Sequence, residues 1–66
     1  MIRVKIISRA KEIELKENKI IAEKLIRKLG FSPDEVVVVR NGEVITEDDE
    51  IYDGDFVEII PVASGG

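Results

Sequence analysis

The sequence predicts an α+β protein in which a single mixed sheet of four to five strands carries one helix packed across one face. Three observations support this prediction. Apolar and polar residues alternate near both ends of the chain, one internal segment repeats its apolar residues every three or four positions, and a run of four valines lies between them. Since the chain has 66 residues, we expect one domain, and one helix in it can cover only one sheet face.

Two strands open the chain as a predicted hairpin. In residues 2–7, Ile2, Val4 and Ile6 share one face, whereas the intervening Arg3 and Lys5 point the other way. Residues 8–11 form the predicted turn. Residues 12–16 then alternate again, with one isoleucine and one leucine facing inward.

The apolar period changes in the next segment. Apolar residues at positions 21, 22, 25, 26 and 29 follow helical spacing and predict one amphipathic helix of about three turns. Asn18 is the expected N-cap and Gly30 the expected C′ residue. Pro33 lies just beyond and prevents the helix from continuing.

The second half of the chain predicts three more strands. Val36–Val39 is β-branched throughout, and Asn41-Gly42 is the strongest hairpin signal in the sequence, which makes residues 44–45 the returning strand. An acidic loop, a short apolar anchor at residues 51–52 and a tight turn at Asp53–Asp55 lead to the final strand over residues 56–62. With the last strand beside the first, this order is the β-grasp architecture of ubiquitin. We expect residues 1–66 to form a single β-grasp domain with residues 63–66 as a flexible tail.

Polar neighbours predict which side chains enter the core, because a strand alternates its faces. The expected core residues are Ile2, Val4, Ile6, Ile13, Leu15, Leu25, Leu29, Val37, Val39, Val57 and Ile59. The same alternation turns Phe56, Ile60 and Val62 to the other face, where Arg40 also places Val38 and, by extension, Val36. We expect these residues to form an apolar partner site beside the tail. The alternatives are scattered exposed hydrophobic residues or a homodimer contact.

Composition excludes several functional classes. The chain has no cysteine and no histidine, so it lacks disulfides, thiolate metal sites and the commonest general base. Its net charge of −4 and 5% aromatic content do not fit a nucleic-acid partner. No apolar stretch approaches the roughly 20 residues of a membrane span, so we expect a cytoplasmic protein that binds no membrane. The acidic segment 47–50 lacks the spacing of a calcium loop and is expected to be solvated, so no metal or cofactor is expected on this chain.

Gly65-Gly66 is the most informative pair in the sequence. Without side chains, two glycines can lie in a narrow channel and approach another active site closely. There the terminal carboxylate can attack the α-phosphate of ATP, and a sulfur nucleophile can then displace AMP. The alternative is a frayed polar terminus, since chain ends are commonly disordered.

Three segments resemble the ThiS/MoaD-like sulfur carriers. Residues 36–44, VVVVRNGEV, resemble the hairpin of that family, residues 25–30, LIRKLG, resemble its helix end, and residues 53–66, DGDFVEIIPVASGG, resemble its ending to the last residue. The match is closest to the short ThiS type, although Asn18 stands where relatives often have a glycine. The resemblance implies that Gly66 is adenylated and thiocarboxylated and that Gly65, with Ser64 before it, fits the enzyme channel.

The resemblance also implies partners. It points to a ThiF/MoeB-like adenylyltransferase of the ubiquitin-activating type, which would supply ATP and magnesium, and to a downstream sulfur-accepting synthase. The chain would then be a carrier rather than an enzyme, monomeric when free, in thiamine, molybdopterin or thiolated-tRNA biosynthesis. A ubiquitin-like modifier conjugated through Gly66 to target lysines is the alternative, and an inert β-grasp interaction module is a third class.

Overall fold

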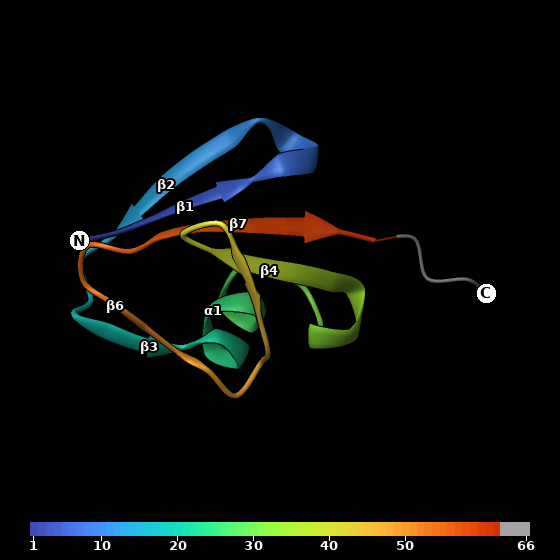
Figure 1. Ribbon diagram of the computed structural model, residues 1–66. Coiled ribbons are helices and arrows are strands. Elements are labelled where there is room, and N and C mark those ends of the chain that lie inside the picture. The colour runs from blue at the N-terminus through green and yellow to red at the C-terminus, as the bar shows by residue number, and fades with distance from the viewer. Residues whose placement is uncertain (63–66) are drawn as a thin grey trace.

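A computed structural model describes residues 1–62 of the chain (Figure 1). Its elements are β1 (Ile2–Ile6), η1 (Ile7–Arg9), β2 (Lys11–Leu15), β3 (Lys19–Ile21), α1 (Ala22–Lys28), η2 (Pro33–Glu35), β4 (Val36–Arg40), β5 (Glu43–Ile45), β6 (Glu50–Tyr52) and β7 (Phe56–Pro61).

The main sheet has five strands in the order β2-β1-β7-β4-β5. The central strands β1 and β7 are parallel, and the other pairs are antiparallel. The helix α1 lies against one face (Figure 1), which confirms the α+β, ubiquitin-like β-grasp fold. One feature was not expected: β3 and β6 pair as a separate two-stranded sheet, so residues 51–52 form a strand rather than a simple anchor.

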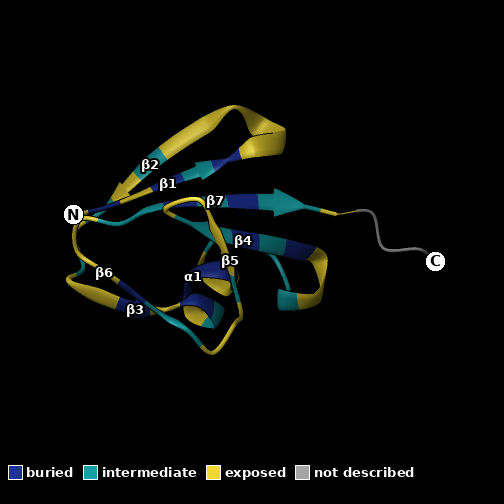
Figure 2. Cartoon of the chain, in the orientation of Figure 1, coloured by how far each residue is buried: buried dark blue, intermediate teal, exposed yellow. Residues whose placement is uncertain are grey.

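The core lies between the five-stranded sheet and α1, where the buried segments gather in Figure 2. Its buried members are Ile2, Val4, Ile6, Ile20, Ala22, Leu25, Ile26, Val36, Val38, Ile51, Val57 and Ile59. The predicted facing of β1 and β7 is confirmed, because their alternate aliphatic side chains are buried. Three further expected residues, Ile13, Leu15 and Leu29, pack partly buried against this cluster.

The predicted facing of β4 is wrong. Val36 and Val38 are buried, with exposures of 8% and 3%, so the valines at 37 and 39 face away from the helix. The prediction used Arg40 as a marker of the outer face, but Arg40 stands opposite the buried Val57 and shares its face. Its long side chain reaches β6, where Nη1 donates a hydrogen bond to the Glu50 carbonyl.

The helix is shorter than predicted and begins differently. It has seven residues, about two turns, because the residues before it pair with β6. Asn18 is not its N-cap. The N–H groups of Ala22 and Glu23 instead donate to the carbonyls of Asp49 and Glu47, each at 2.9 Å. No helix within residues 1–62 is long and apolar enough to cross a membrane.

The helix ends as predicted. Gly30 has a φ of +91°, and its N–H donates to the Arg27 carbonyl at 3.0 Å. The N–H of Phe31 reaches back to the Ile26 carbonyl at 3.1 Å, which completes a Schellman motif. Glycine is favoured at this position because a left-handed conformation is strained for a residue with a Cβ.

Candidate functional site

The sheet face opposite the helix carries an apolar patch. Val37 lies directly opposite Ile60 of β7, and Val39 lies directly opposite Val44 of β5. Directly opposed residues project from the same face of an antiparallel pair. Together with Phe56 at the start of β7, these four residues form what we call the outer-face patch. All five are at least partly exposed, and Val44 is 72% exposed.

The outer-face patch agrees with part of the predicted facing of these side chains and corrects part of it. Phe56 and Ile60 lie on the face opposite the helix, as expected, and Val62 is 44% exposed. Val38 does not belong to this face because it is buried in the core beside Ile59. Val37 takes the position next to Ile60 that the sequence interpretation assigned to Val38.

The chain leaves the sheet at the end of β7. The N–H of Val62 donates to the Glu35 carbonyl at 2.8 Å, so the last described residue is held beside η2. Ala63 to Gly66 lie outside the described residues, and the predicted site residues Ser64, Gly65 and Gly66 are among them. The structure therefore fixes the position of Val62, from which residues 63–66 continue.

A charged margin borders the patch on its β1 side. Arg3 of β1 is exposed beside Phe56, and its guanidinium lies 5.5 Å from the centre of the phenyl ring. Arg3 also forms a salt bridge with Glu12 of β2. Their hydrogen bond, reinforced by charge attraction, raises the pKa of Arg3 and lowers the pKa of Glu12 below its ordinary value. The outer face therefore passes from aliphatic on β4 and β5 to charged on β1 and β2, with Glu58 of β7 standing opposite Val39 between them.

The Asn41-Gly42 hairpin and the Asp53–Asp55 turn lie next to each other, at the end of the sheet opposite the C-terminal end of β7. Asn41 donates from Nδ2 to Asp55 Oδ1 at 3.0 Å and accepts the Phe56 N–H on Oδ1 at 3.0 Å. The other carboxylate oxygen of Asp55 accepts the Tyr52 N–H at 2.9 Å. Asn41 and Gly42 both have positive φ, as a type I′ turn requires. These residues fix the β4–β5 hairpin to the start of β7, which sequence reasoning did not anticipate.

Among residues 1–62, no group of three or more acidic, histidine or cysteine side chains is arranged to hold a metal ion. The acidic segment instead forms a turn. Asp49 Oδ2 accepts hydrogen bonds from the Thr46 N–H at 2.9 Å and from its hydroxyl at 3.3 Å. The carboxylate of Asp49 therefore stabilises this turn.

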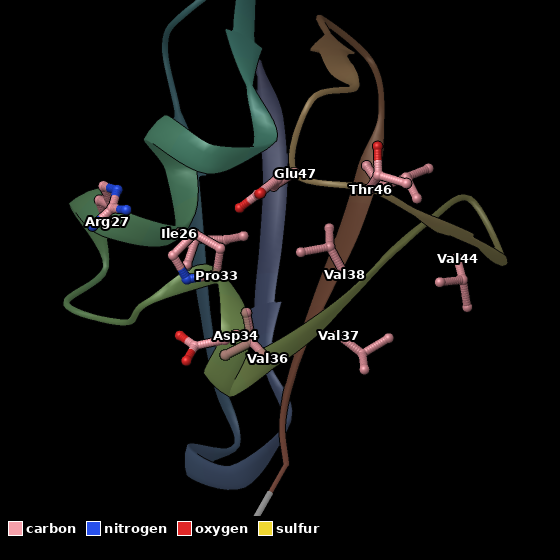
Figure 3. A pocket seen from close by; sticks show the side chains of 11 residues that line it. Ile26, Arg27, Pro33, Asp34, Val36, Val37, Val38, Val44, Thr46 and Glu47 are labelled. Carbon is pink, nitrogen blue, oxygen red and sulfur yellow. The ribbon is translucent and has the colours of Figure 1, made fainter. Parts of the chain in front are cut away.

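An open groove of about 480 Å³ lies on the helix side of the sheet edge, between α1, η2, β4 and β5 (Figure 3). It forms because β5 ends at Ile45, opposite Val38, so the first two residues of β4 have no neighbour on that side. The chain then turns toward α1, where the Glu47 carbonyl meets the Glu23 N–H. Sequence reasoning did not identify this groove, because no local pattern marks where a neighbouring strand stops.

The fold places the chain among the ubiquitin-like β-grasp proteins. Residues 4–66 match the ThiS family, and the chain belongs to that family. It is 39% identical over 56 residues to the sulfur carrier protein TtuB of Thermus thermophilus, a match that covers 85% of each chain. It is also similar to the NMR structure of a thiamine biosynthesis protein from Geobacter metallireducens, with 25% identity and a TM-score of 0.60 over 97% of this chain and 87% of the other. The resemblance predicted from the motifs is confirmed.

Proposed function

We propose that this protein is a sulfur carrier whose Gly66 carboxylate is adenylated by a partner enzyme and converted to a thiocarboxylate. One observation carries the proposal: the family match extends to residue 66, so Gly65-Gly66 falls within the matched segment rather than beyond it. The 39% identity to a protein named as a sulfur carrier supports the same role. The chain is then the substrate of an enzyme, and ATP and magnesium bind that enzyme.

The proposed chemistry needs only the chain end. A carboxylate oxygen of Gly66 attacks the α-phosphorus of ATP, and pyrophosphate leaves to give the acyl-adenylate. A sulfide nucleophile then attacks the glycyl carbonyl carbon, and AMP departs with the oxygen that joined it, leaving the thiocarboxylate. The carrier supplies no general base or metal in these steps, in agreement with its lack of histidine and cysteine.

The outer-face patch is the proposed docking surface for a ThiF/MoeB-like adenylyltransferase. An exposed group of aliphatic side chains next to the point where the tail leaves can exclude water around a docked enzyme. Changing Ile60 or Val37 to Asp should weaken binding to the enzyme while the protein stays folded, because both side chains lie on the outer face. Unchanged affinity in both folded variants would place the enzyme elsewhere.

Intact mass of the protein purified from its native cells tests the central proposal. One terminal oxygen replaced by sulfur supports the carrier, and deleting Gly66 should abolish pyrophosphate exchange with the enzyme while folding persists. Undiminished exchange by the shortened chain would refute the proposal. The alternative is a protein modifier, a role that the ubiquitin-like fold also supports. In that case the native cells would contain conjugates of this chain to target lysines. Identifying the sulfur acceptor would then show which downstream synthase, for thiamine, molybdopterin or thiolated tRNA, uses this carrier.

A further inference from the structure

The groove at the β5 edge is continuous with the outer-face patch. Val37 and Val44 belong to the patch and also line the groove, and Figure 3 shows both on its β4–β5 side. Because β5 is the edge strand of the five-stranded sheet and is only three residues long, the two surfaces meet around it. The apolar surface therefore turns around the sheet edge and continues onto the helix side, where Ile26 and Val36 lie in the groove. A partner that covers the patch would therefore lie directly beside this groove.

The rim of the groove is acidic. Asp34 of η2 and Glu47 after β5 both line it, and both residues are exposed. Within the described part of the chain, neither carboxylate takes part in a salt bridge, whereas Arg27, the one basic residue of the lining, is paired with Glu23 at 3.1 Å. The groove therefore offers an apolar floor between two carboxylates whose charge is not matched.

The negative charge of the rim indicates which kind of partner can bind in this groove. A second copy of the chain would bring a net charge of −4 and the same acidic rim to the contact, and like charges facing each other are unfavourable. The phosphates of a nucleic acid would be repelled in the same way. A protein segment that carries an apolar side chain next to a lysine or arginine could pack the apolar side chain on the floor and pair the basic one with a carboxylate of the rim.

We propose that the adenylating enzyme that docks on the outer-face patch reaches around the β5 edge and places such a basic, apolar segment in the groove. This inference rests on the proposed function, because it assigns a second contact to the same enzyme. The patch then supplies apolar contact, and Asp34 and Glu47 steer the approach and fix the orientation of the carrier on the enzyme.

The test compares Glu47→Lys and Asp34→Lys with Asp53→Lys, a matched charge reversal in the turn before β7, at the end of the sheet opposite the C-terminal end of β7. Pyrophosphate exchange is measured with the recombinant ThiF/MoeB-like enzyme of the same organism, at low and high salt. All three positions are exposed, and melting curves check that each variant is folded. We expect each groove variant to raise KM for the carrier by roughly tenfold at low salt, with kcat unchanged, and the increase to shrink at high salt.

A third groove variant tests the floor separately from the charge. Thr46→Trp places a large side chain at the exposed edge of the groove and should also raise KM, by obstruction, at every salt concentration. If the unmodified carrier is adenylated but Glu47→Lys and Asp34→Lys change KM no more than Asp53→Lys does, the groove contact is refuted and the proposed function stands. If the unmodified carrier is not adenylated, the proposed function fails and the groove contact fails with it.

Discussion

Replacing Val38 with alanine should destabilise the protein much more than the same replacement at Val37. The two positions are adjacent on β4 and carry the same side chain, so strand propensity and position in the chain are matched. They differ in facing: Val38 is 3% exposed and packs in the core, whereas Val37 is partly exposed on the outer face beside Ile60. The pair therefore isolates the contribution of burial.

The magnitude follows from what each truncation removes. Val38→Ala removes two buried carbons, about 1.6 kcal/mol at about 0.8 kcal/mol for each. The closed cavity that remains adds to this loss, which gives about 2–3 kcal/mol in total. Val37→Ala removes the same carbons from a partly wet surface and leaves no closed cavity, so we expect less than about 1 kcal/mol. For a domain of this size, 1 kcal/mol corresponds to a shift of roughly 4–8 °C in Tm.

Thermal melting followed by circular dichroism gives the Tm of each variant, and urea titration gives the free energy of unfolding. An unchanged m value would show that both variants unfold from the same compact state. We expect Val38→Ala to melt more than about 8 °C below the unmodified protein and Val37→Ala to melt within a few degrees of it. Equal losses, or a larger loss at Val37, would refute the assigned facing of β4 and with it the outer-face patch.

Three further changes test other parts of the structure. Gly30→Ala should lower the free energy of unfolding by about 1–2 kcal/mol through backbone strain alone, because φ is +91° and an added Cβ meets no atom within 4 Å; a Tm equal to that of the unmodified protein would contradict the Schellman geometry. Asn41→Ala should cost about 1–3 kcal/mol in urea titration, because the Phe56 N–H and Asp55 lose their partner, and a neutral change would show that the hairpin is held otherwise. The pKa of Glu12 lies below its ordinary value, so its contribution to stability is present at neutral pH and is lost as the pH falls through the lowered pKa; NMR titration should show the low pKa, and Glu12→Gln should remove the corresponding part of the acid sensitivity.

The facing of β1 and β7 could be predicted because each strand carries a charged residue between its aliphatic ones. Lys5 and Glu58 mark the outer face directly, and the register places them side by side. The run of four valines in β4 has no such marker. Arg40, which was used instead, lies on the inner face at the sheet end, where its long side chain reaches the Glu50 carbonyl of β6. The predicted facing was therefore right for Phe56 and Ile60 and wrong for Val38.

Other features had no local signature in the sequence. The first turn of α1 donates its N–H groups to carbonyls of the loop after β5, and backbone carbonyls leave no compositional trace. The strands β3 and β6 are three residues each and lie far apart in the chain, so neither shows a clear alternation. The Asn41-Gly42 turn and Gly30, in contrast, could be predicted because positive φ restricts the residue type.

The parallel pairing of β1 with β7 has a consequence for synthesis. The register joins Arg3 to Phe56 and Ile6 to Ile59, so the strand at the centre of the sheet is the last one to leave the ribosome. Until it does, β1 and β4 lack their common neighbour, and Val57 and Ile59 are missing from the core. Such distant pairing forms slowly, because a long loop must close before any contact rewards it. Folding thus waits for translation through β7, and we expect a chain interrupted earlier to stay unfolded and open to proteases.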